Sequence, residues 1–153
     1  MAVAAAPAQT APGVKNVYAF LKLHQPGNIA ADPEGRPLQE GPDTLYTVYV
    51  ETDRPDIEWK KAYVNGRIYA ITCSPVGTTP FRVGAEKRSG RKIFLSASKG
   101  NRLWQLDLGV TNEKPVHRQK ITPGEIILEG KKENRKIIMK VSVVVELREI
   151  PSA

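Results

Sequence analysis

The chain has 153 residues, of which 41% are hydrophobic and 25% are charged, and these values are typical of one globular domain that buries a core. No run approaches the roughly 18 consecutive apolar residues of a membrane-spanning helix, so composition excludes that class. A single cysteine, Cys73, excludes an internal disulfide and a cysteine-rich zinc site. The formal net charge of +7 favours anionic partners but does not specify a fold.

The first residues differ in composition from the rest of the chain. The sequence MAVAAAPAQTAP contains small residues and prolines, and no charge occurs before Lys15. Small residues of this kind end a signal peptide, but the basic start and the apolar stretch of a complete one are missing. We expect residues 1–13 to be a signal-peptide remnant or a flexible tail, ahead of a single domain at 14–150. The first interpretation places the protein in the periplasm or outside the cell, and the second in the cytoplasm.

The domain is predicted to consist of short β-strands, because apolar and polar side chains alternate with a period of two. In the first half of the chain this pattern predicts the strands Val17–His24, Thr44–Glu51, Ile57–Val64 and Arg67–Cys73. Asn65-Gly66 predicts a tight hairpin, since both positions of a type I′ turn need a positive φ. The Cys73 side chain is expected to be buried. The proline-rich stretch Pro26–Pro42 is predicted to be a long loop, a frequent place for function.

The second half of the chain continues the same pattern. It predicts, in order, Pro80–Val83 as an edge piece, Lys92–Ala97, Arg102–Leu108, His117–Ile121 as an edge strand, and Glu125–Glu129 joined through Gly130–Arg135 to Ile137–Leu147. The last of these strands has the clearest alternation, with one uninterrupted apolar face. Ile138 and Val144 interrupt its polar face. We therefore expect a central strand that is paired on both sides.

Short strands with turns at fairly even spacing predict an all-β protein. Our first expectation is an antiparallel β-sandwich of immunoglobulin-like architecture, with Trp59 in the core between the two sheets. A closed or partly open β-barrel is the alternative. The paired cysteines and the tyrosine-corner spacing of antibody domains are absent, so the likeness extends to the architecture and not to a family.

Positive charge is concentrated in the second part of the chain. Residues 1–60 carry 5 Lys and Arg against 8 Asp and Glu (net −3), and residues 61–153 carry 18 against 8 (net +10). We expect the steepest stretch to bind an anionic partner through Arg82, Lys87, Arg88, Arg91, Lys92, Phe94, Lys99 and Arg102. Phe94 is predicted to face outward with Lys92 and Ser96. The other explanation is a solvated strand edge, where lysines prevent aggregation.

No catalytic residue, metal site or cofactor is predicted. His24 and His117 are far apart in sequence, and no closely spaced group offers three metal ligands. The nucleophile elbow and the phosphate-binding glycine patterns are also absent. Asp53, Asp56 and Glu58 lie beside aromatic residues, as in some carbohydrate sites, but two of them flank a proline turn where Asp is common for backbone reasons.

By elimination, we expect a non-catalytic binding module that is exported and recognises an acidic protein patch or an anionic glycan or surface. A single-stranded nucleic-acid-binding barrel is one alternative, because such proteins combine a basic groove with aromatic stacking. A structural subunit that assembles through its edge strands is another. The oligomeric state is not specified by the sequence.

Overall fold

The computed structural model describes residues 13–24, 33–34, 43–53, 57–77, 79–111, 124–142 and 144–148. Several predictions lie outside these residues: the N-terminal segment before residue 13, most of the Pro26–Pro42 loop, the edge strand His117–Ile121, and Val143. The described part contains no helix of the length and apolarity needed to cross a membrane.

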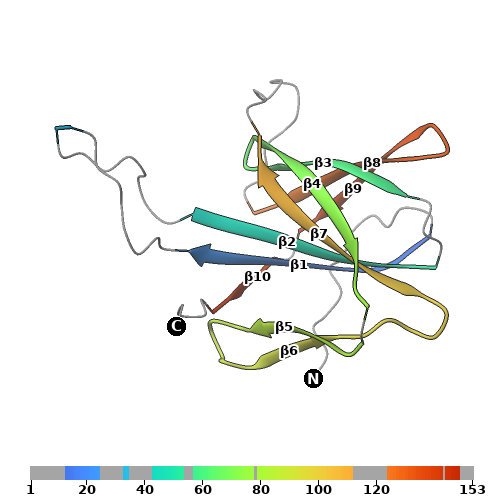
Figure 1. The fold of residues 1–153 in the computed structure, drawn as a ribbon, viewed down its shortest axis with the longest axis horizontal. Helices are drawn as coiled ribbons and strands as arrows, with labels where there is room; N and C mark the ends of the chain where they lie inside the picture. The colour runs from blue at the N-terminus through green and yellow to red at the C-terminus, as the bar shows by residue number, and fades with distance from the viewer. Residues whose placement is uncertain are drawn as a thin grey trace.

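The described residues form ten β-strands and no helix, which confirms the all-β prediction (Figure 1). The strands are β1 (Val14–His24), β2 (Asp43–Thr52), β3 (Glu58–Val64), β4 (Arg67–Pro75), β5 (Phe81–Ala85), β6 (Lys92–Leu95), β7 (Arg102–Val110), β8 (Ile126–Lys132), β9 (Arg135–Val141) and β10 (Val144–Leu147).

Eight of these described strands form one curled sheet in the order β10-β1-β2-β7-β4-β3-β8-β9, and β5 pairs with β6 in a separate hairpin (Figure 1). Neighbours in the large sheet are antiparallel except β1 and β10, which run parallel. The curled sheet resembles half of a barrel. Two facing sheets of immunoglobulin-like topology are therefore not confirmed.

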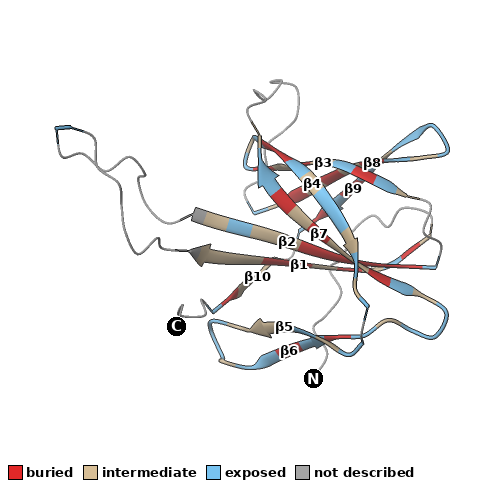
Figure 2. Cartoon of the chain, viewed as in Figure 1, coloured by how far each residue is buried: buried red, intermediate tan, exposed pale blue. Residues whose placement is uncertain are grey.

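The curled sheet buries side chains on both of its faces. One core cluster contains side chains from one face of every strand of the large sheet except β10, and Val48, Leu106 and Met139 are each fully buried in it. A second cluster lies on the other face of β1, β2 and β7, where Phe20 and Leu103 meet the β5–β6 hairpin. In Figure 2, buried positions are coloured red both on strands of the large sheet and on β6 of the hairpin. The hairpin is thus packed against the sheet and covers part of its outer face.

The strand predicted over Ile137–Leu147 is divided into two. Its first part, β9, lies at one end of the strand order beside β8, and its second part, β10, lies at the other end beside β1. The apolar face changes sides at the break, because Met139 and Val141 belong to the first core while Leu147 belongs to the second. The prediction of one central strand is wrong for β9, which pairs only with β8 among the described strands. Val144, on the other face of β10, packs against the first core, which explains why it is apolar.

The hairpin predicted at Asn65-Gly66 is confirmed. Asn65 has a φ of 50° and Gly66 a φ of 81°, as a type I′ turn requires. Trp59, expected in the core, is only 5% exposed. The prediction for Cys73 is wrong, since this residue is exposed. The β3–β4 pairing stops at Ala70, so β7 is the one described strand that pairs with the end of β4.

Gly130 lies where β8 closely approaches β3. A side chain there would begin 2.8 Å from the carbonyl oxygen of Glu58 and 3.0 Å from Trp59 Cε3. Gly130→Ala is therefore expected to lower the free energy of unfolding by about 1–3 kcal/mol, measured by urea denaturation. Gly77→Ala is the matched control, because nothing lies within 4 Å of that position. Equal stability of the two variants would contradict this close approach.

Candidate functional site

The β5–β6 hairpin carries most of the basic segment that the sequence singled out. Its strands pair with Phe81 opposite Leu95 and Arg82 opposite Phe94. Alternation along the strands places Ile93 and Leu95 in the second core, each 3% exposed, and leaves Phe94 on the opposite face. One face of the hairpin is therefore anchored and the other faces solvent.

Aromatic packing holds the inner face of the hairpin against the sheet. The Phe81 ring lies 5.7 Å from the Tyr49 ring, and Tyr49 meets Phe20 edge to face at 5.8 Å between ring centroids. Burial, with a smaller contribution from the charge of Asp107, raises the pKa of Tyr49 to about 12. The phenol of Tyr49 is thus neutral at physiological pH.

Strand β10 holds one end of the hairpin through backbone hydrogen bonds. The Lys87 amide donates to the Glu146 carbonyl at 3.0 Å, and the Arg148 amide donates to the Ala85 carbonyl at 2.8 Å. Lys87 Nζ also forms an ion pair with Glu146 Oε2 at 2.8 Å. A side chain at Gly90 would begin 2.9 Å from Arg148 Nη2, so the Arg148 guanidinium lies against the turn of the hairpin.

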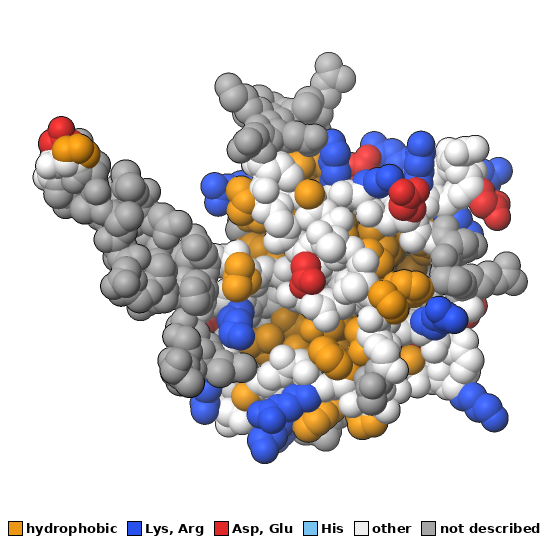
Figure 3. Space-filling model, in the orientation of Figure 1, with side chains coloured by type: hydrophobic (Ala, Val, Ile, Leu, Met, Phe, Trp, Pro, Cys, Tyr) orange, Lys and Arg blue, Asp and Glu red, His pale blue; other side chains and the backbone are white. Residues whose placement is uncertain are grey.

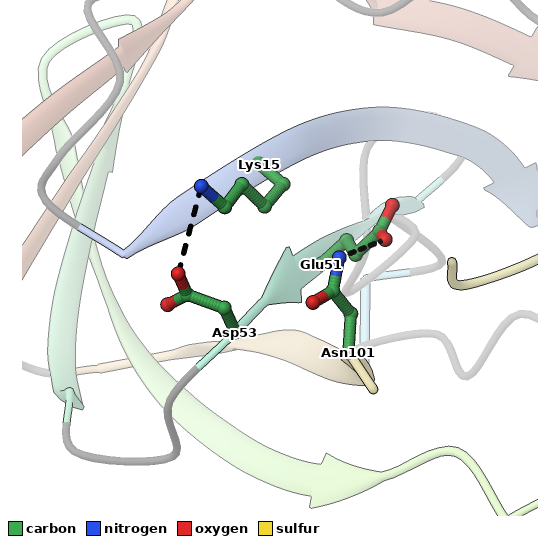
Figure 4. Close-up of polar contacts among 4 residues, drawn as sticks. All are labelled: Lys15, Glu51, Asp53 and Asn101. Carbon is green, nitrogen blue, oxygen red and sulfur yellow. Dashed lines mark hydrogen bonds and ion pairs between the residues drawn. The ribbon is translucent and has the colours of Figure 1, made fainter. Parts of the chain in front are cut away.

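The buried carboxylate of Glu51 holds the other end of the hairpin, where β6 leads into β7. Asn16 Nδ2 donates to Glu51 Oε1, while the Ser98 amide and Asn101 Nδ2 both donate to Oε2, each at 2.8 Å. Figure 4 shows Asn101 directed at Glu51, beside the exposed ion pair of Lys15 Nζ with Asp53 Oδ2 at 3.5 Å. Glu51 is 1% exposed.

The hydrogen bonds to Glu51 decide its charge state. Burial by itself raises the pKa of this carboxyl, but the hydrogen bonds from Asn101, Asn16 and Ser98 together outweigh it and leave the pKa below its ordinary value. Glu51 is therefore ionised at neutral pH. Its role in the described structure is to connect β1, β2 and the turn that precedes β7.

All eight residues predicted to bind an anion are exposed. Lys87 is in its ion pair with Glu146, and Arg91 has a polar interaction of its own. Five of the predicted cations form no ion pair within the described part of the chain: Arg82, Arg88, Lys92, Lys99 and Arg102. Figure 3 shows Lys and Arg side chains interspersed with hydrophobic ones along the lower rim of the molecule, where β5 and β6 lie. The β5–β6 hairpin thus carries six of the eight predicted residues, while Lys99 lies in the turn after β6 and Arg102 begins β7.

Arg148 adds a cation that the sequence did not assign to this site. It lies far along the chain from the basic segment, and only the pairing of β10 with β1 and the hairpin places it there. A second basic group lies on β8 and β9, where Lys131, Arg135 and Lys140 are exposed. In that group, Lys136 Nζ is paired with Glu129 Oε1 at 3.1 Å.

The acidic residues near Trp59 do not converge on a carbohydrate site. Glu58 is exposed and bonded to Lys60, Asp53 is paired with Lys15, and Asp56 lies outside the described residues. Among the residues that the structure describes, no group of three His, Cys, Asp or Glu could hold a metal ion. His117 and the His24 side chain are not described.

Comparison of the chain with protein-family models, with curated proteins and with solved structures finds no match in any of the three. The fold and the site therefore define the class of protein in physical terms: an all-β protein with a basic hairpin docked on a curled sheet.

Proposed function

We propose that this protein is a non-catalytic binding module whose β5–β6 hairpin recognises an anionic partner. The candidate classes are an acidic protein patch, an anionic glycan or surface, and a single-stranded nucleic acid. The observation that supports this most is a group of exposed cations that have no ion pair in the described part: Arg82, Arg88 and Lys92 on the hairpin, with Lys99 and Arg102 between the hairpin and the start of β7. Like charges held close together raise the local potential, which attracts anions and speeds their association.

The attachment of the hairpin adds to this argument. Its apolar face is buried in the second core, β10 holds its turn, and Glu51 holds its exit into β7. Cations on a scaffold that is already ordered lose little conformational freedom when they bind, so more of the electrostatic attraction remains as affinity. The same attachment explains why the hairpin accommodates so many charged residues, because these residues lie on its solvent face and not on the face that is buried.

The test is binding to heparin, poly-glutamate and phosphatidylserine vesicles at about 50 mM salt. We expect binding to at least one of these probes, and Arg82→Glu, Arg88→Glu and Lys92→Glu together are expected to weaken it by about tenfold or more. The control reverses Lys131, Arg135 and Lys140 to Glu, which changes the net charge equally but leaves the hairpin unaltered. Thermal unfolding checks that both variants fold.

Two results would contradict the proposal. Absence of binding to all three probes at low salt removes the anionic partner. Equal weakening by the hairpin variant and by the control shows that net charge, and not the hairpin, accounts for binding.

Assembly through edge strands has one feature in its favour, the edge of β9 that pairs with no other strand described in the structure. Ile138 on this strand is 44% exposed. The same strand carries Arg135, Lys136 and Lys140, and cations on an edge strand oppose pairing with an identical edge. Light scattering that shows a concentration-dependent dimer would favour this second function.

A further inference from the structure

Phe94 differs from the other large apolar side chains at the surface. Four such side chains are exposed among the described residues, and Phe94, at 48%, is the only aromatic one: Leu45, Phe94, Val110 and Ile138. The other rings of this region face the core, as Phe81 does in its contact with Tyr49. The Phe94 ring makes no ring contact within the described part.

The register of the hairpin surrounds this ring with cations. Arg82 is the cross-strand partner of Phe94, and side chains paired in this way have Cβ atoms about 5 Å apart. Lys92 lies two residues away on the same strand and the same face, at roughly 7 Å. Arg88 and Arg148 extend the positive charge beyond the turn.

We propose that the anionic partner of this hairpin is a single-stranded nucleic acid, with a base stacked on Phe94 and phosphates bound by Arg82, Lys92 and the neighbouring cations. This inference rests on the proposed function and specifies its ligand. Proteins that bind single strands combine a basic track with exposed aromatic rings, because every base offers a flat face for stacking. A duplex keeps its base faces stacked inside, and the carboxylates of an acidic peptide are small anions with no aromatic surface to stack on the ring, so neither uses it.

The geometry of the hairpin sets the size of the site. The four residues of β6 span about 13 Å, which corresponds to a contact of only a few nucleotides. Such a short track predicts modest affinity and little sequence preference, because stacking and phosphate contacts are available with any base. Each phosphate contact on a single strand contributes about −0.7 to the slope of log K against log salt.

The test measures fluorescence anisotropy with labelled oligothymidylate of about 12 nucleotides, with heparin as a polyanion that has no bases. Phe94→Ala is expected to weaken oligonucleotide binding by roughly 5- to 150-fold, the loss of one stacked base, with an unchanged salt slope. Heparin binding by the Phe94→Ala variant stays at the wild-type level. The control Ile138→Ala, which removes a similarly exposed aliphatic side chain on β9, changes neither oligonucleotide binding nor heparin binding. Phe94→Trp, which keeps an aromatic ring at this position, binds the oligonucleotide at least as tightly as the wild-type protein.

The cations are tested through the salt dependence. Arg82→Ala together with Lys92→Ala is expected to reduce the magnitude of the oligonucleotide salt slope by about 1.4, because two phosphate contacts are lost. An unchanged slope would overturn the assignment of these two residues to phosphates.

The remaining outcomes separate this inference from the proposed function. Binding of heparin without binding of the oligonucleotide overturns the nucleic-acid ligand and leaves the anionic partner in place. Phe94-dependent binding to phosphatidylserine vesicles, without oligonucleotide binding, also overturns it and identifies a membrane surface instead. No binding to any of the probes contradicts both proposals.

Discussion

Glu51→Ala is expected to lower the free energy of unfolding by about 3 kcal/mol or more. The substitution removes the acceptor of three hydrogen bonds and leaves the Asn16 and Asn101 amides and the Ser98 N–H without a partner at a site that is 1% exposed in the native protein. An unsatisfied buried donor costs about 1–3 kcal/mol. Urea denaturation followed by circular dichroism measures this loss. A loss below about 1 kcal/mol would contradict a structural role for the carboxylate.

Glu51→Gln separates the charge of the carboxylate from its shape. Hydrogen bonds lower the pKa of Glu51 in the folded protein below that of the unfolded chain. The resulting stability is complete above the unfolded pKa, and it is lost as the pH falls through the folded value. We expect the wild-type protein to lose stability over this acidic range more steeply than the Gln variant. Identical pH profiles of the two proteins would show that Glu51 does not titrate with folding.

Val141→Asp is expected to lower the free energy of unfolding by about 4 kcal/mol or more, enough to unfold many domains. Val141 is fully buried among apolar side chains of the first core, near the end of β9. A carboxylate there has to be desolvated without a partner or protonated at a cost. The measurement is thermal unfolding, with urea denaturation if the variant remains folded.

Ile138→Asp is the matched control for this prediction. Ile138 lies on the same strand but on the other face, and it is 44% exposed. Its substitution is expected to change the free energy of unfolding by about 0.5 kcal/mol or less, because the charge stays hydrated. Similar losses in both variants would mean that the two faces of β9 are assigned incorrectly.

Local patterns predicted most of the strands and the solvent face of the candidate site. Alternation alone placed β2, β3, β4 and β7 close to their observed bounds, because side chains of a strand point alternately to its two faces. The Asn65-Gly66 turn was predictable because few other residue pairs adopt positive φ at both positions. Phe94 was predicted to face outward because it alternates in phase with Lys92, and this is confirmed by its exposed fraction of 48%.

Features that depend on distant contacts were not predictable in this way. An alternation of apolar and polar residues with a period of two does not show which sheet edge a strand joins. The division of Ile137–Leu147 between β9 and β10 was therefore missed. Cys73 shares its phase with buried residues but lies beyond the end of the β3–β4 ladder. The export prediction and the roles of the hairpin residues stay predictions.

The sequence by itself determined that this protein is all-β, where its tight turn at Asn65-Gly66 lies and which segment concentrates positive charge, since each of these follows from neighbouring side chains. The tertiary structure alone decided that one sheet curls to form two cores, that Arg148 joins the basic hairpin, and that Glu51 is buried among Asn16, Ser98 and Asn101. The physical reason is that these contacts join residues far apart in the sequence, 50 positions for Glu51 and Asn101 and more for Arg148 and Ala85, and no local pattern specifies which strand edges and faces meet.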